Sequence, residues 1–223
     1  MKVNQVSFVL LLFFSICTLS LVSGEQFYIV TSPNSPCPTR EQGEPCLTLD
    51  QYTSNPSLSS KVTLVMESGN HVFEESKQLT GTNFSMISEG AKIIPDKRNY
   101  FYTGLTLSYR YNYVTMSGIN FSSTFGYYTE IRFDYLQKLI IQDCNFQGIG
   151  IYIYSATNAT FLRCAFSDYY YNDYQGALGI SRSSTVSVIQ SNFTNNTGAI
   201  RLRSCYSHYA PTNLIVYSEM QFH

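Results

Sequence analysis

Carboxylates and arginines are the side chains through which this chain could act on an acidic carbohydrate. Clustered acids hold Ca²⁺ or transfer protons, and Arg or Lys binds carboxylates. The acids in the repeated segments are Glu130, Asp134, Asp143, Asp168, Asp173 and Glu219. The arginines spread along these segments are Arg132, Arg163, Arg182, Arg201 and Arg203. Neither set clusters, and paired-Asp and Gly-His-Gly signatures are missing, so we interpret them as solvated surface charges and predict no catalytic residue.

The histidines offer no alternative chemistry. His71, His208 and His223 lie too far apart for a metal site or a triad, and we interpret each as a loop histidine. The sequence has no Gly-rich phosphate loop, Cys-x-x-Cys pair or Ser-based elbow. We therefore expect no metal and no cofactor.

The cysteines point to disulfide chemistry. Cys37 and Cys46 enclose a Pro- and Gly-containing loop, a spacing suited to a local disulfide. Cys144 and Cys164 hold the same position in two successive repeats, where either a disulfide or two buried thiols would fit. Cys205 is left as the odd cysteine, and a partner in sequence beyond this chain is a natural hypothesis.

Tyrosines gather in two long connections between repeats. They are Tyr127, Tyr128, Tyr169, Tyr170, Tyr171 and Tyr174. Exposed tyrosines stack on sugar rings or bury well at protein interfaces, so these six are candidate ligand contacts. The alternative is that Tyr simply suits a half-exposed sheet surface.

Internal repeats show which elements must position these side chains. Four segments align without gaps: VTMSGINF (Val114–Phe121), LIIQDCNF (Leu139–Phe146), ATFLRCAF (Ala159–Phe166) and VSVIQSNF (Val186–Phe193). A fifth, IVYSEMQF, runs from Ile215 to Phe222. A shorter apolar pattern precedes each of them, beginning at Gly104, Glu130, Gly150, Gly176 and Gly198. Apolar residues alternate with polar ones at a period of two, which predicts two short strands and a corner per repeat.

A repeat of 20 to 29 residues without helix-length segments favours an all-β fold, a right-handed parallel β-helix. Equivalent strands would stack about 4.8 Å apart, with the terminal Phe residues forming an internal column. An antiparallel sandwich is the alternative, but it does not explain motifs that repeat in the same sense.

The two ends of the chain differ from the repeats. Residues 1–24 have the form of a secretory signal peptide, with a membrane anchor as the alternative. Residues 25–60 are expected to form an N-terminal strand and a disulfide-bearing cap, with one or two helical turns at residues 48–52. Residues 61–223 would form the β-helix. No cap is visible after Phe222, so we expect either a fragment of a longer array or an open end that docks or self-associates.

Composition limits the partners. The chain has 14 Lys and Arg against 15 Asp and Glu, and only 13% charged residues, which argues against nucleic acid. No second apolar stretch could span a membrane. Five N-x-S/T sequons agree with export, at Asn83, Asn120, Asn158, Asn192 and Asn195.

From Glu25 onward the chain resembles the secreted right-handed β-helix repeat proteins, pectate-lyase-like solenoids, of sponges and other early-branching animals. The residues that carry the resemblance are Cys37-Pro38, Gly43–Leu49 with Tyr52, Gly69–His71, Asn83–Met86 and Asn120-Phe121 with its repeats. The resemblance implies a β-helix and an extracellular location, and little about chemistry.

These observations favour a secreted or cell-surface recognition module, not an enzyme, that binds an extracellular glycan or protein. A polysaccharide lyase or hydrolase is the first alternative, because the fold hosts such enzymes although fold does not imply function. A structural component of the extracellular matrix is the second.

Overall fold

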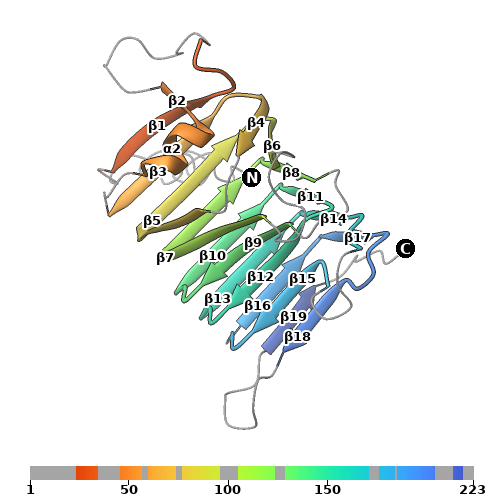
Figure 1. Cartoon of the computed structure of the whole chain (residues 1–223). Helices are drawn as coiled ribbons and strands as arrows, with labels where there is room; N and C mark the ends of the chain where they lie inside the picture. The colour runs from red at the N-terminus through yellow and green to blue at the C-terminus, as the bar shows by residue number, and fades with distance from the viewer. Residues whose placement is uncertain are drawn as a thin grey trace, which may run out of the picture.

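The structure is a computed structural model that describes residues 24–34, 46–56, 60–73, 77–95, 105–123, 129–170, 176–183, 185–203 and 213–217. Within these ranges the chain is mostly β-strand, with one short helix. Every strand pair is parallel, and the strands run in chain order from β1 at one end of the molecule to β18 and β19 at the other (Figure 1). The all-β, parallel-sheet prediction is therefore confirmed.

The strands form three stacks, each named here after one of its members. The β10 stack contains β3 (Lys61–Met66), the second halves of β5 (Lys77–Ser88) and β7 (Leu105–Ser117), β10 (Lys138–Gln142), β13 (Asn158–Leu162), β16 (Thr185–Ile189) and β19 (Asn213–Tyr217). The β12 stack contains the first halves of β5 and β7, then β9 (Thr129–Asp134), β12 (Gly150–Tyr154), β15 (Leu178–Ser181) and β18 (Ile200–Arg203). The β11 stack contains β4 (Gly69–Phe73), β6 (Ala91–Pro95), β8 (Asn120–Ser122), β11 (Asn145–Gln147), β14 (Ala165–Ser167) and β17 (Asn192–Thr194).

The register of the β11 stack confirms the predicted Phe column. Phe121, Phe146, Phe166 and Phe193 pair in succession, and their ring centroids stack 5.1, 5.1 and 4.5 Å apart. All four are at most 2% exposed. Burial of these rings against one another is the regular part of the core.

Two of the predicted alignments need correction. β19 pairs Leu214, not Ile215, with Val186, so the fifth repeat is one residue out of the ungapped alignment. In the first repeat Leu107, not Leu105, pairs with Ile131. The two-residue shift in the first repeat leaves the predicted inward residues on the same face of the strand. The one-residue shift in the fifth repeat exchanges the inward and outward positions. Phe222 lies outside the described residues.

The corners between stacks in the later repeats contain residues with positive φ. Gly118, Asp143, Arg163 and Gln190 follow equivalent strands, and all have φ between 49° and 70°. The other two corners hold Tyr135, Ser155 and Arg182, and Gly148, Asp168 and Asn195, also with positive φ. In these repeats, a left-handed residue at the corner turns the chain from one stack to the next.

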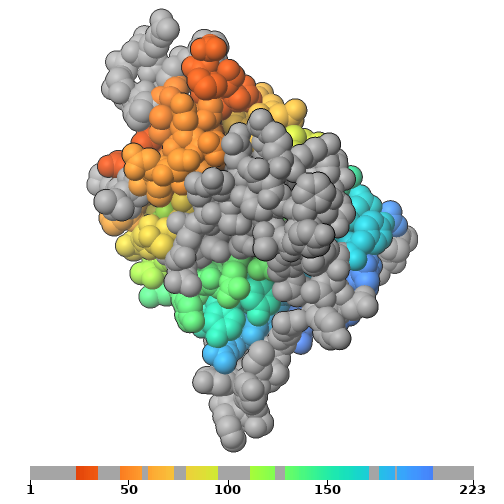
Figure 2. Space-filling view, viewed as in Figure 1, coloured from red at the N-terminus to blue at the C-terminus, as the bar shows by residue number. Residues whose placement is uncertain are grey.

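The N-terminal part departs from this regularity. β1 (Glu25–Val30) pairs with β3 and with β2 (Cys46–Thr48), and helix α2 (Leu49–Ser54) follows directly. Thr48 and Gln51 form a capping box that fixes the start of the helix. The predicted helical turns are confirmed, and Tyr52 buries its ring against Phe27 at 5.3 Å. β2 and α2 lie at the surface of this end of the molecule (Figure 2).

Candidate functional site

Among the described residues, a group of polar and aromatic side chains lies on the outer side of the β12 stack. We call it the Arg–Tyr cluster; it consists of Arg132, Asp134, Tyr135, Tyr152, Tyr154 and Arg182. On β9 and β12 its members alternate with inward residues such as Ile131 and Ile153, which are at most 2% exposed. Since Arg132 pairs with Tyr152 and Asp134 with Tyr154, the parallel register alone brings these four side chains together.

Arg132 is held in place by a buried carboxylate two residues away on the same strand. Its Nε donates to both oxygens of Asp134, at 2.8 and 3.0 Å. The side chain of Asp134 is 3% exposed, whereas that of Arg132 is 39% exposed. The buried acid therefore orients a guanidinium that still reaches solvent.

Tyrosine rings pack against the charged groups. The Arg132 Cζ lies 5.3 Å from the ring centroid of Tyr152 and 5.9 Å from that of Tyr154. Arg182 lies 5.2 Å from the Tyr154 ring, and Tyr135 meets the same ring edge-on, at 5.3 Å and 83°. Tyr154 thus sits at the centre of the cluster, within cation–π distance of two arginines.

The pKa values of Arg132 and Tyr154 are both shifted upward, away from neutral pH. Burial lowers the pKa of Arg132, but the hydrogen bond and charge of Asp134 outweigh it and hold the pKa above its ordinary value. Desolvation raises the pKa of Tyr154, against the opposing charge of Arg182. Arg132 is therefore a permanent cation and Tyr154 a neutral phenol.

The predicted tyrosine contacts have mixed outcomes. Tyr127, Tyr128, Tyr171 and Tyr174 lie outside the described residues. Tyr170 is 65% exposed, as a ligand contact requires. Tyr169 is 1% exposed, so its assignment as a surface contact is wrong. Its ring fills the space above Gly150, where an added Cβ would lie 2.9 Å from the ring.

The tyrosines of the Arg–Tyr cluster were not among the predicted contacts. The predicted contacts are in long connections, whereas Tyr152 and Tyr154 lie on a strand and Tyr135 follows one directly. A signal was present: Tyr152 and Tyr154 alternate with inward Ile151 and Ile153, one repeat after Arg132 and Asp134.

All five sequon asparagines lie within the described residues. Asn83 and Asn158 face outward on the β10 stack, and Asn120 and Asn192 are on the β11 stack. Asn195 occupies the corner after β17. Asn158, Asn192 and Asn195 are exposed, and Asn83 and Asn120 are half-buried. Their glycosylation stays a prediction.

Cys144 and Cys164 are free, buried thiols, which decides between the two alternatives that their spacing left open. Cys144 and Cys164 lie at equivalent positions between parallel strands, which are spaced about 4.8 Å apart, and a disulfide needs Cβ atoms about 3.8 Å apart. Burial raises the pKa of Cys144 to about 11 and that of Cys164 to about 12, so both stay protonated. Cys37 and Cys205 lie outside the described residues, and the predicted Cys37–Cys46 disulfide stays a prediction.

Some predicted surface charges are buried. Glu130 is 4% and Asp134 is 2% exposed, which corrects their interpretation as solvated charges. Asp143 and Arg163 do lie at the surface, where they form an ion pair of 2.6 Å between successive corners. His71 is on β4 and 1% exposed, so it is not a loop histidine.

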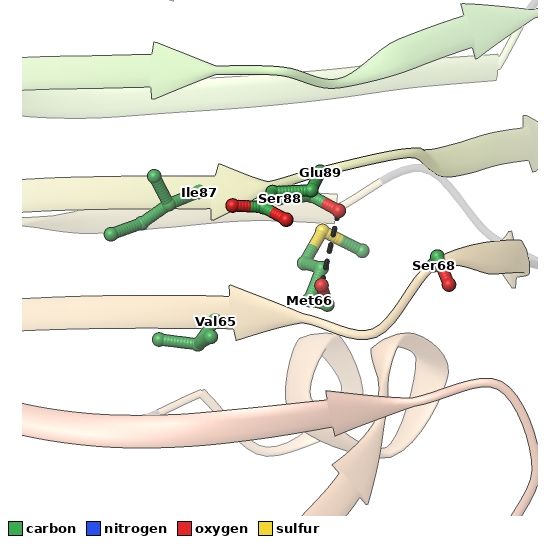
Figure 3. A pocket seen from close by; sticks show the side chains of 6 residues that line it. All are labelled: Val65, Met66, Ser68, Ile87, Ser88 and Glu89. Carbon is green, nitrogen blue, oxygen red and sulfur yellow. Dashed lines mark hydrogen bonds between the residues drawn. The ribbon is translucent and has the colours of Figure 1, made fainter.

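A second feature is an open hollow of about 480 Å³ at the N-terminal repeats, lined by Val65, Met66, Ser68, Ile87, Ser88 and Glu89 (Figure 3). The side chains of Val65 and Ile87 lie on neighbouring strands, and Ser88 closes one edge by donating to the Met66 carbonyl at 3.0 Å. Among the described residues that line it, Glu89 is the one charged residue. The hollow therefore has less specific chemistry than the Arg–Tyr cluster.

Comparisons with protein-family models, curated proteins and solved structures return no match for this chain. In the ranges that the structure describes, no group of three or more His, Cys, Asp or Glu side chains could hold a metal ion. No helix among the described residues is long and apolar enough to cross a membrane.

Proposed function

We propose that this protein is an exported recognition module, a right-handed parallel β-helix that binds an extracellular ligand through the outer side of its β12 stack. The three parallel stacks and their regular register support the β-helix. A cap at the N-terminal end, made of α2 and a Cys37–Cys46 disulfide, would close the core there. Residues 1–24 would direct the chain to the secretory pathway.

One observation carries the proposal: the Arg–Tyr cluster and the sequons lie on different sides of the molecule. Of the five sequon asparagines, two are on the β10 stack, two on the β11 stack and one at the corner after β17. None is on β9, β12, β15 or β18. N-linked glycans would lie on the first two stacks and not on the third, where Arg132 and Tyr135 reach solvent.

The experiment adds one glycan to each side in turn. On β7, Thr106→Asn creates the sequon Asn-Leu-Ser on the β12 stack, and Tyr113→Asn creates Asn-Val-Thr on the β10 stack. The two substitutions are on the same strand, so Tyr113→Asn is the matched control. Removal of the glycans by an endoglycosidase would verify that each one was attached.

The labelled full chain is then applied to a glycan microarray and to live animal cells. We expect saturable binding that Thr106→Asn abolishes and Tyr113→Asn preserves. Equal loss in both variants, or binding that never saturates, would contradict the proposal. Release of reducing ends from acidic polysaccharides would instead favour the enzyme alternative.

A further inference from the structure

The Arg–Tyr cluster presents Arg132 in a restricted way. Its Nε is occupied by Asp134, and within the part of the chain that the structure describes its two terminal amino groups make no hydrogen bond. Its Cζ lies near the rings of Tyr152 and Tyr154. The side available to a ligand is therefore an edge with two parallel donors, the geometry that a carboxylate accepts.

The surroundings reduce the cost of binding there. The acceptor that orients Arg132 is 3% exposed, and the neighbouring rings limit its rotamers. An arginine fixed before the ligand arrives loses less side-chain entropy on binding. The two arginines of the cluster face two acids, Asp134 and Glu130, whose charges both act on Arg132, so the attraction for an anionic group comes from the oriented guanidinium and not from net charge.

The rings discriminate between kinds of ligand. Sugars stack on open ring faces, but the Tyr152 and Tyr154 rings already pack against the guanidinium groups of Arg132 and Arg182. The open aromatic surface is that of Tyr135, which is 61% exposed and stands edge-on to Tyr154. Tyr135 and Arg132 both contact Tyr154, and exposed Tyr and oriented Arg are the residue types that dominate protein–protein interfaces.

We propose that the Arg–Tyr cluster docks a partner protein, whose Asp or Glu side chain pairs in bidentate fashion with Arg132 while an adjacent apolar side chain packs on Tyr135. This inference rests on the proposed function and names the class of partner. Asp134 acts as a positioning residue for Arg132. An acidic glycan and a second copy of the chain are the competing occupants.

The test selects peptides from a random phage-displayed library on the immobilised full chain. We expect enrichment of sequences with Asp or Glu next to an aromatic or aliphatic residue. The enriched sequences are then made as synthetic peptides. Arg132→Lys keeps the charge but loses the planar guanidinium, and should lower the affinity for these peptides by about tenfold or more. Arg163→Lys is the matched control, because Arg163 is also an exposed, ion-paired arginine, and should leave their affinity unchanged.

Two further variants separate folding from binding. Tyr135→Ala should reduce the affinity for the same peptides. Asp134→Asn should reduce it too. On the Asp134→Asn protein, replacing the Glu of a peptide by Gln should change the affinity less than it does on the wild type. Circular dichroism melting verifies that each variant is folded. If Arg132→Lys unfolds, Arg132→Gln takes its place and must show the same loss of peptide affinity.

The proposal is overturned if no acidic peptide is enriched or if Arg132→Lys binds it as well as the wild type. An acidic glycan is the occupant instead if no peptide binds and Arg132→Lys abolishes binding of polygalacturonate or chondroitin sulfate. A second copy of the chain is the occupant instead if Arg132→Lys abolishes self-association measured by ultracentrifugation. Those two results would keep the β12 stack as the recognition surface. Loss of saturable binding to every probe would remove the proposed function itself.

Discussion

The N-terminal and C-terminal parts of the β11 stack build the same inward column from different side chains. In the later repeats the column is Phe121, Phe146, Phe166 and Phe193, each stacked on a copy of itself. In the earlier ones the register continues it with Ile93 and His71. The later part gains stability from repetition, whereas the earlier part depends on contacts that occur once.

The contacts of the N-terminal part that do not recur in other repeats lie around helix α2. Tyr52 packs on Phe27, and Phe84 packs on Tyr111 at 5.2 Å. Burial of their hydroxyl groups raises the pKa of Tyr111 to about 12 and that of Tyr52 further. His71 donates from Nε2 to the Glu67 carbonyl at 2.7 Å, and its Nδ1 is buried with no hydrogen-bond partner among the described residues. Unlike the Phe column, this region contains polar groups that burial destabilises.

The largest effect is expected where the repetition is strongest. Phe146→Ala removes a ring stacked on both sides and should lower the free energy of unfolding by about 3–5 kcal/mol. The measurement is urea denaturation followed by circular dichroism. Phe27→Ala is the comparison in the N-terminal part and should cost less, because Phe27 is only half-buried. Equal losses would contradict the idea that the repeated column dominates stability.

The boundary between the two parts predicts the second effect. Gly118 has φ of +70°, and an added Cβ would lie 2.0 Å from the Ser88 carbonyl oxygen. The equivalent Gln190 carries a side chain at nearly the same φ. Glycine is needed at position 118 because the backbone of the preceding repeat, at Ser88, leaves no room for a side chain. Gly118→Ala should therefore destabilise the protein by about 1–3 kcal/mol. Gln190→Ala should melt at the wild-type temperature, and an equal loss there would contradict the comparison.

The third effect depends on pH. Burial lowers the pKa of His71, despite the opposing influence of Glu67, so the folded protein binds a proton less readily than the unfolded chain. Stability should then fall as the pH drops below about 6.5, by up to ~1.4 kcal/mol per pH unit. His71→Leu should remove this slope between pH 7 and pH 5. Urea titrations at both pH values measure it, and an unchanged slope would mean that His71 does not cause the acid sensitivity.

The repeated part was predictable from sequence because its physics is periodic. Strand alternation and the Phe column follow from side chains that recur at the same position, and the register of β10, β13 and β16 confirms them. The helical turns at α2 were also predictable, since a capping box is a local signal. The one-residue shift at Leu214 was not, because a gap in a connection leaves no trace in an ungapped alignment.

The candidate site was less predictable, because it depends on contacts between repeats. Arg132 and Tyr152 are 20 positions apart, and only the pairing of β9 with β12 makes them neighbours. Likewise, the burial of Tyr169 depends on the space that Gly150 leaves on an adjacent strand. The burial of His71 follows from its place in a column whose other members are apolar. Such pairings become visible once the repeats are aligned in register.

The smallest effect is expected at the exposed ion pair of two later corners. Asp143 accepts from Arg163 at 2.6 and 2.7 Å, but both side chains are more than two-fifths exposed and water and salt screen their attraction. The hydrogen bond from Arg163 lowers the pKa of Asp143, so any contribution would be present at neutral pH and lost in acid. Asp143→Asn keeps a residue that tolerates the left-handed corner. Its melting temperature at pH 7 should equal that of the wild type. Asp134→Asn, which alters the buried carboxylate that pairs with Arg132, should lower it. Equal losses in the two variants would show that position along the repeats, rather than burial, decides what a salt bridge contributes.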